Sequence, residues 1–263
     1  MLDHEPLIRL SVFAAVLAAM AALEHAFPRR PQRLGWRRWP SNLGLVALSS
    51  ALLRLVAPAG AVGVALWAET QGLGLFRWIG ASFWVATVAS VLLLDLLIYV
   101  QHRVFHAVPL LWRLHRVHHA DPELDASSGL RFHPVEILLS LAIKAVAVVA
   151  LGAPPEAVLT FEVLLNATAL FSHANLALPA WLDRPLRLVL VTPDMHRVHH
   201  SEIERETNSD FGFCLSVWDR IFGTYIAEPE RGQLSMVIGI EGFRADRQQR
   251  IDRLLVQPLK AKI

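Results

Sequence analysis

The chain is poor in cysteine and in charged residues. Cys214 is its one cysteine among 263 residues, and 18% of the residues are charged, against about 25% in an ordinary soluble domain. A single cysteine excludes an internal disulfide, an iron–sulfur cluster and a zinc ribbon, because each of these needs several thiols. The sequence also lacks the His-Glu-x-x-His pattern of zinc hydrolases and a Gly-rich dinucleotide fingerprint. Cysteine-based metal sites and a built-in nicotinamide domain are therefore excluded.

Long apolar runs take the place of the missing charge. Hydrophobic residues make up 54% of the chain, and several runs approach the roughly 20 residues that a helix needs to cross a bilayer. These runs cover residues 6–27, 42–67, 81–100, 135–151 and 155–176. Because the second run contains Arg54 and Pro58, we expect it to be kinked or partly re-entrant. The sequence predicts an all-α integral membrane bundle with four to five spans.

Basic residues after the first run predict the orientation of the bundle. The densest basic patch between spans consists of Arg29, Arg30, Arg33, Arg37 and Arg38, and basic loops stay on the cytoplasmic side. With this patch inside, the third run returns to the cytoplasmic face. The last two runs then form a hairpin that leaves and comes back. We therefore expect the segments after the third and fifth runs to lie on the cytoplasmic side.

Histidines are concentrated in these segments. The chain has 12 histidines, and most of them fall in three short clusters. The clusters are His102 with His106, His115 with His118 and His119, and His196 with His199 and His200. Residues at i, i+3 and i+4 of a helix share one face, so each triplet is expected to direct two or three imidazoles to a single point. Imidazole suits zinc, copper, iron and nickel, and eight or more histidines indicate two metal ions.

Four further histidines lie outside the clusters. His173 ends the fifth run and is expected to reach the same membrane face as the clusters. His133 stands where the fourth run begins, so it is either a further ligand or a capping residue. His4 and His25 have no companions at ligand spacing, and we interpret them as structural or interfacial.

Several polar residues share helical faces with these histidines. Asp95 and Tyr99 fall on one stripe with the first cluster, and Asn166 falls on one stripe with Glu162 and His173. A carboxylate such as Asp95 either accepts the spare ring N–H of a ligating histidine or satisfies hydrogen bonds between helices. Asp219 is either a supporting residue of the site or an ion-pair partner of a nearby arginine.

Aromatic residues follow the last triplet. Phe211, Phe213, Trp218, Phe222 and Tyr225 lie in NSDFGFCLSVWDRIFGTY. Aromatic side chains are enriched at membrane interfaces. We expect this stretch to pack the cytoplasmic cap onto the bilayer surface.

The order of these motifs closely resembles the fatty acid hydroxylase/sterol desaturase superfamily. The resemblance covers roughly residues 95–225 and rests on HRVFH, LHRVHHADPELDASSGLRFHPVE, FSHANL and DMHRVHHS followed by WDRIFGTY. LRFHP and WDRxFGT look most like the bacterial sterol desaturase-like branch. The resemblance implies a membrane-embedded core with a cytosolic helical cap that holds a non-haem di-iron centre. The ligands that it carries over are the eight clustered histidines and His173. Some relatives have a second histidine where this chain has Ala169, so we expect water, His133 or a polar group to complete that shell.

The resemblance also implies an activity. Two iron ions and O2 would hydroxylate or desaturate a lipid, of the sterol, hopanoid or fatty acyl type. Electrons would come from an external ferredoxin, cytochrome b5-type protein or flavin reductase, and no nucleic-acid partner is expected. Two alternatives are a divalent-metal transporter, whose site usually lies near the bilayer midplane, and a membrane metallohydrolase.

The expected organisation has three parts. Residues 1–80 hold the N-terminal spans and the basic cytoplasmic loop, residues 81–227 form the hydroxylase-type catalytic domain, and residues 228–263 form a cytoplasmic tail. The expected location is the bacterial inner membrane, with the metal site on the cytoplasmic face.

Overall fold

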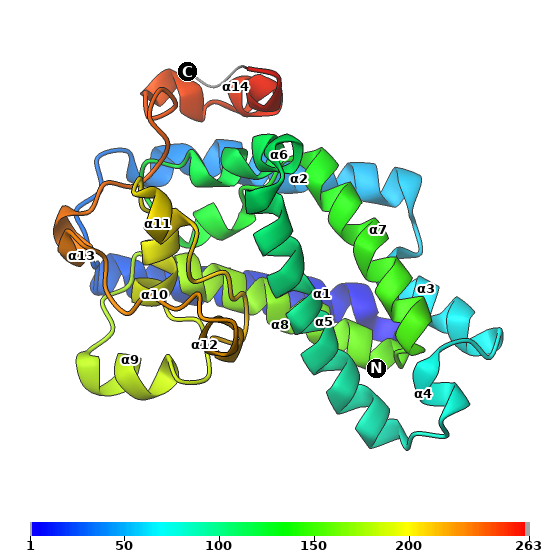
Figure 1. Cartoon of the computed structure of the whole chain (residues 1–263). Helices are drawn as coiled ribbons and strands as arrows, with labels where there is room; N and C mark the ends of the chain where they lie inside the picture. The colour runs from blue at the N-terminus through cyan, green and yellow to red at the C-terminus, as the bar shows by residue number, and fades with distance from the viewer. Residues whose placement is uncertain (1, 261–263) are drawn as a thin grey trace.

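Helices form the whole framework of the protein. A computed structural model describes residues 2–260, so Met1 and the last three residues of the expected C-terminal tail lie outside the described residues. Within that range there is no strand, and pairing between extended segments is limited to isolated bridges such as Pro28 with Leu176. The predicted all-α fold is confirmed (Figure 1).

Six longer helices build the bundle. They are α1 (Glu5–Ala26), α2 (Trp39–Val56), α3 (Gly60–Thr70), α5 (Phe83–Ala107), α7 (Pro134–Leu151) and α8 (Pro155–His173). Four segments are long and apolar enough to cross a membrane: Glu5–Ala26, Gly35–Trp78, Phe83–Ala107 and Pro134–Leu151. Helix α8, the expected fifth span, is not among them. It packs against α1, α3 and α5, and most of its first two turns is buried.

The second apolar segment is broken, as its proline predicted. Helix α2 ends at Val56, and α3 begins only at Gly60, with Pro58 between them. Proline lacks the backbone N–H that continues a helix, and Gly60 adopts a left-handed φ of +56°. A short helix, α4 (Leu75–Trp78), completes the segment.

The expected hairpin between the last two runs is also present. Helix α7 ends at Gly152, whose φ of +65° is left-handed. A Cβ on Gly152 would lie 2.7 Å from the carbonyl oxygen of Leu73, so glycine allows the hairpin to approach the segment before α4. Behind it, side chains of α3, α5, α7 and α8 form the main apolar core, including Ala65, Leu94, Val148 and Phe161.

Short helices form a cap around the other ends of the long helices. In Figure 1 they gather at the left and at the top, away from the N-terminus and α4. The short helices of the cap are α6 (Pro109–His119), η3 (Ala126–Leu130), α9 (Ala180–Leu186), α10 (Pro193–His199), α11 (Glu204–Thr207), α12 (Val217–Ile221), α13 (Gly232–Ser235), η4 (Asp246–Gln249), α14 (Ile251–Val256) and η5 (Gln257–Leu259). Two further short helices are η1 (Leu2–His4) at the N-terminus and η2 (Gly35–Arg38) before α2.

One member of the basic patch is not at the surface. We expected Arg38 in a basic cytoplasmic loop, but its side chain is 1% exposed. Its guanidinium pairs with Asp125 and with Asp121, whose Oδ1 lies 2.6 Å from Nη1, and it donates to the carbonyl oxygen of Glu123 at 2.6 Å. Asp121 and Arg131, 3.7 Å apart, extend the cluster. Arg38 thereby ties the start of α2 to the segment that follows the first histidine triplet.

Candidate metal centre

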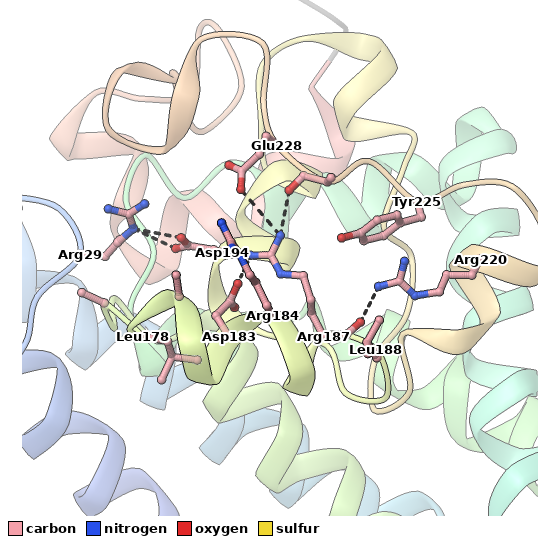
Figure 2. A pocket seen from close by; sticks show the side chains of 13 residues that line it. Arg29, Leu178, Asp183, Arg184, Arg187, Leu188, Asp194, Arg220, Tyr225 and Glu228 are labelled. Atoms are coloured by element: carbon pink, nitrogen blue, oxygen red, sulfur yellow. Dashed lines mark hydrogen bonds and ion pairs between the residues drawn. The ribbon is translucent and has the colours of Figure 1, made fainter.

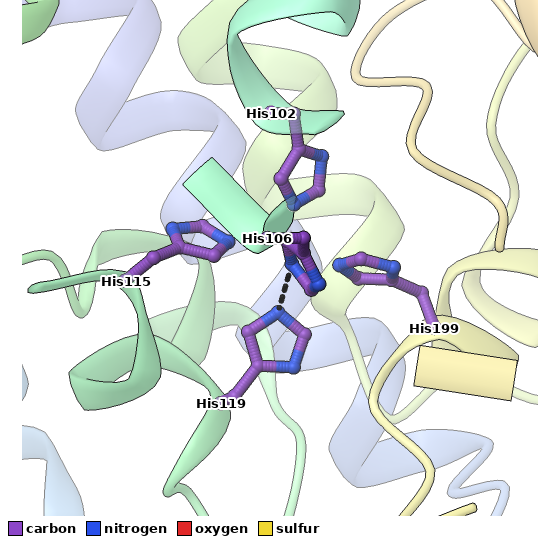
Figure 3. Close-up of side chains that lie close together, drawn as sticks. All are labelled: His102, His106, His115, His119 and His199. Carbon is purple, nitrogen blue, oxygen red and sulfur yellow. Dashed lines mark hydrogen bonds between the residues drawn. The ribbon is translucent and has the colours of Figure 1, made fainter. Parts of the chain in front are cut away.

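Nine histidines meet in two adjacent groups where the long helices end. The first group consists of His102, His106, His115, His119 and His199, and the second group of His118, His173, His196 and His200. In each group one candidate ligand atom per residue lies within 4.8 Å of all the others. Figure 3 shows the rings of the first group converging from α5, α6 and α10.

Each His-x-x-His-His triplet is divided between the two groups. On α6, His115 and His119 belong to the first group and His118 to the second. The triplet of α10 does the reverse, since His199 joins the first group while the other two join the second. Two imidazoles of each triplet therefore meet at one point, the lower number that the spacing predicts, and the third belongs to the other group. On α6 and on α10, the three histidines cover a helix face about 100° wide, which is wide enough to reach both groups.

The two groups are in contact with each other. The rings of His119 and His200, one from each group, stack with their centroids 4.5 Å apart. His196 and His199 also stack across the boundary, at 5.2 Å. This proximity fits two sites that share one reaction centre.

Hydrogen bonds on the outer side orient the rings of the first group. The Nδ1–H of His102 donates to the carbonyl oxygen of Phe211 at 2.8 Å, and that of His199 donates to Ser209 at 2.7 Å. His115 Nδ1 lies 2.6 Å from Glu136 Oε1. The Nε2 atoms of all three rings are buried and have no hydrogen-bond partner among the described residues. A neutral imidazole with Nδ1–H occupied presents its Nε2 lone pair to a metal, so this group fits a metal ion.

Nitrogen atoms crowd together in the second group. His173 Nε2 lies 3.1 Å from His118 Nε2 and 3.0 Å from His196 Nε2. His173 Nδ1–H donates to the carbonyl oxygen of Ala169 at 2.7 Å, so its Nε2 carries a lone pair. A neutral His118 or His196 ring at this distance either donates its Nε2–H to His173 or, as the Nδ1–H tautomer, turns its own lone pair to the same point, where a cation can bind. The backbone oxygen of Ala169 thus orients the ring of His173 from outside the group.

Burial keeps these histidines neutral. Burial lowers the pKa of His115 to about 3. Burial, and then the neighbouring histidines, hold the pKa values of His118, His199 and His200 well below the usual 6.5. Because metals bind the neutral ring, these sites stay competent well into the acidic range.

His133 lies outside both groups. Its Nε2 donates to the carbonyl oxygen of Leu255 at 3.2 Å, and its Nδ1 accepts from the backbone N–H of Val135, which caps α7. Of the two roles left open for it, the structure places it in the capping one. His4 and His25 are likewise in neither group and are exposed.

Three of the expected supporting residues make contacts away from the rings. Asp95 accepts from the Nε1–H of Trp218 at 2.8 Å and from two backbone N–H groups of the loop before α12. The hydroxyl of Tyr99 bonds Thr224 at 2.8 Å. Asn166 donates to the Glu162 carbonyl in its own helix at 2.8 Å. Asp95 therefore joins α5 to the loop before α12, rather than holding a histidine.

Asp219 acts on the site through the backbone. Its carboxylate accepts from the N–H of Phe211 at 2.7 Å and of Gly212 at 2.8 Å, and Phe211 in turn holds His102. The ring of Phe211 is buried, with its centroid 5.4 Å from those of His102 and His199. The expectation that Phe211 packs against the bilayer is therefore wrong, because its ring fills the space beside the histidines.

Glu136 is the supporting carboxylate that the sequence interpretation missed. It lies in the first turn of α7, 4% exposed, three residues after His133 in LRFHPVE. A carboxylate at the start of an otherwise apolar run is a signal that could have pointed to it. Its partner His115 is 21 residues earlier, so no helical stripe connects the two in the sequence.

Replacing Glu136 with Ala is expected to lower metal affinity 10- to 100-fold, the usual effect of losing an outer hydrogen bond to a ligating histidine. Glu136→Gln keeps an acceptor oxygen, so its metal affinity should lie between those of Glu136→Ala and the wild type. Chelator competition monitored by bound metal measures the effect. The exposed Glu204→Gln is the control, and an Ala variant that binds metal as tightly as this control would remove Glu136 from the site.

Another buried carboxyl group, that of Asp210, lies next to the residues that hold the first group. Asp210 sits between Ser209 and Phe211, whose carbonyl oxygens hold two of the rings, and its φ of +47° is left-handed. Burial, and then the charge of Asp219, raise the pKa of Asp210 to about 9. The carboxyl is therefore protonated at neutral pH.

Asp210→Asn is expected to stabilise the metal-free protein at alkaline pH. Between about pH 4 and about pH 9, the folded state keeps a proton on Asp210 that the unfolded state has lost. Stability from this group therefore falls as pH rises through that window. Asparagine is neutral throughout and tolerates the left-handed backbone. Between pH 6 and pH 9, the melting temperature of the variant should fall less than that of the wild type. An equal fall in both proteins would contradict the protonated state of Asp210.

Comparisons with known proteins were made for the whole chain. The sequence model of the fatty acid hydroxylase family matches residues 87–224, just over half of the chain. Ornithine lipid hydroxylase OlsE of Rhizobium tropici is 33% identical over 145 residues, which are 55% of this chain and 42% of that protein. Alkylglycerol monooxygenase of Homo sapiens is 30% identical over 173 residues, 63% of this chain and 35% of that protein. Fatty acid hydroxylase vlmA of Lecanicillium sp is 28% identical over 157 residues, 54% and 42% of the two chains.

The matched part of the chain therefore spans less than half the length of these relatives. No solved structure matches the chain at a significant level. The family match includes all nine grouped histidines and the segment around Asp219. The predicted superfamily is confirmed: the chain belongs to the fatty acid hydroxylase family.

Proposed function

We propose that this protein is a membrane-bound di-iron enzyme that uses O2 to hydroxylate a lipid. The observation that carries the proposal is the pair of adjacent histidine groups, in which three rings of the first group have buried, unpartnered Nε2 atoms and the Nε2 atoms of the second group lie about 3 Å apart. The names of the relatives support the reaction class, since they are a lipid hydroxylase, a monooxygenase and a fatty acid hydroxylase. Because these names describe oxygen insertion, hydroxylation is favoured over desaturation.

The first group would hold one iron ion and the second group the other. When bound, the two ions supply the activation of O2 that an unreactive lipid C–H bond requires. The protein's own residues hold the rings in place: Phe211 and Ser209 fix His102 and His199 from outside, and Glu136 fixes His115. Burial of the rings keeps bulk water away from the reacting atoms.

Orientation and partners belong to the same proposal. Residues 81–227 would form the catalytic domain, with the metal centre on the cytoplasmic face of the bacterial inner membrane. The residues before and after them would supply further spans and a cytoplasmic tail. A separate ferredoxin, cytochrome b5-type protein or flavin reductase would deliver electrons, because these 263 residues have one cysteine and no dinucleotide fingerprint.

The position of the site argues against the transporter alternative. Transport sites usually lie near the bilayer midplane, whereas His106 and His173 lie at the last turns of α5 and α8. The metallohydrolase alternative has no observation in its favour.

Labelled oxygen tests the proposed activity. Cells that express the protein, and cells that lack it, are grown under 18O2, and their lipids are compared by mass spectrometry. A lipid that gains one 18O atom only in the expressing cells is expected. Identical lipids in both, or an added oxygen that comes from water, would overturn the assignment.

A further inference from the structure

Exposed apolar side chains gather on one side of the cap. They lie on α9, in the turn after it and at the end of α12, and we call this set the α9–α12 face: Trp181, Leu188, Val189, Ile221 and Phe222. Trp181 is 76% exposed and Ile221 is 61% exposed. Exposed apolar side chains that gather on one side of a protein mark contact with another protein or a membrane.

Contacts with α5 show where this face lies along the span. Trp218 of α12 donates to Asp95 at 2.8 Å, and the ring of Phe222 stacks on Tyr99 at 5.3 Å. Tyr99 is the last residue but one of the apolar run 81–100, and Asp95 lies four residues before it, about 6 Å along a helix. Helix α12 therefore packs where the apolar run of α5 ends, and Val100 and Val104 of α5 are exposed there as well.

A pocket with surplus positive charge borders the α9–α12 face. Its volume is about 520 Å³, and Arg184, Arg187, Arg220 and Arg29 line it together with Tyr225 (Figure 2). Arg29 and Arg187 pair with Asp194 and Asp183, and Glu228, the third carboxylate of the lining, lies 3.8 Å from Arg187.

The other two arginines of the pocket keep their charge available. Among residues 2–260, no carboxylate lies within ion-pair distance of Arg184 or Arg220. Arg184 is exposed. The guanidinium of Arg220 lies 3.9 Å from the centroid of the Tyr225 ring, so the ring holds it at the pocket.

We propose that the α9–α12 face enters the lipid head-group layer and that Arg184 and Arg220 bind the phosphate of an anionic phospholipid there. An apolar face flanked by arginine is the pattern of segments that lie in the membrane interface. Guanidinium groups bind phosphate oxygens through paired, charge-assisted hydrogen bonds. The contacts of α12 with α5, a helix long and apolar enough to cross a membrane, favour a lipid over an acidic protein at this pocket. Such a site is separate from the metal centre and does not depend on lipid oxidation.

Lipid selectivity tests the pocket. The full chain is placed in nanodiscs that contain spin-labelled phosphatidylglycerol or spin-labelled phosphatidylcholine, and the fraction of immobilised label is measured. The wild type should prefer phosphatidylglycerol, and Arg184→Gln and Arg220→Gln should each lower that preference about five-fold. The control variant Arg205→Gln/Arg247→Gln removes two exposed arginines outside the pocket and should keep the preference.

Three results would overturn the assignment. They are equal retention of both lipids by the wild type, a preference that survives loss of both pocket arginines, and displacement of phosphatidylglycerol by inorganic phosphate at equal concentration. Quenching by brominated lipids tests the depth of the face independently. The fluorescence of Trp181 is obtained as the difference between the wild type and Trp181→Phe, and brominated lipids should quench it strongly. An unquenched Trp181 would place the face in water. Unchanged bound metal and far-UV circular dichroism confirm that the variants are folded.

Discussion

Replacing His199 or His118 with Ala is expected to abolish lipid oxidation and to lower bound metal from two ions toward one per chain. Each substitution removes one ligand from a different group. The remaining rings are held by contacts of their own, such as that of His102 with Phe211, so the protein should stay folded while its site is incomplete. Metal analysis of the purified variants and the 18O lipid assay measure the two effects.

A matched control separates a ligand role from the loss of any histidine. His25→Ala removes an exposed histidine outside both groups and should leave metal content and activity unchanged. If His199→Ala and His118→Ala both kept full activity and wild-type metal content, the two groups would not be metal sites.

Arg38→Met is expected to destabilise the protein by about 3–5 kcal/mol, the usual cost of leaving a buried charge without its partner. Arg38 pairs with both Asp121 and Asp125, and all three side chains are at most 2% exposed. Without the guanidinium, Asp125 loses its cationic partner, and Asp121 keeps only Arg131 at 3.7 Å. The segment after His119 should loosen, and with it the end of α6 that carries two of the ligands.

The neighbouring residue provides the control for this prediction. Arg37 is exposed, so Arg37→Met removes the same charge without breaking a buried pair and should shift stability little. Thermal or denaturant unfolding in detergent compares the variants. A melting temperature for Arg38→Met equal to that of Arg37→Met would show that the buried cluster does not stabilise the cap.

Local spacing explains why much of the site could be predicted. The i, i+3 and i+4 repeats on α6 and α10 are properties of single helices, and the family motifs fix their order along the chain. Span length and apolar content likewise identified the four candidate spans, and Pro58 predicted the break between α2 and α3.

Tertiary packing decided what could not be predicted. The division of each triplet between two groups depends on how α6 and α10 lie against α5 and α8, which no local pattern encodes. Three of the outer hydrogen-bond acceptors are backbone carbonyls, of Phe211, Ser209 and Ala169, and any residue type offers the same oxygen. Helix α8 was interpreted as a span because of its apolar run, but Glu156, Glu162 and Asn166 interrupt that run, and α8 is not among the four segments that are long and apolar enough to cross a membrane.

Anomalous X-ray scattering at the iron edge, from crystals of the iron-loaded protein, locates the metals directly. Two peaks are predicted, one among His102, His115 and His199 and the other among His118, His173 and His196. A single peak, or iron bound away from these rings, would contradict the dimetal centre.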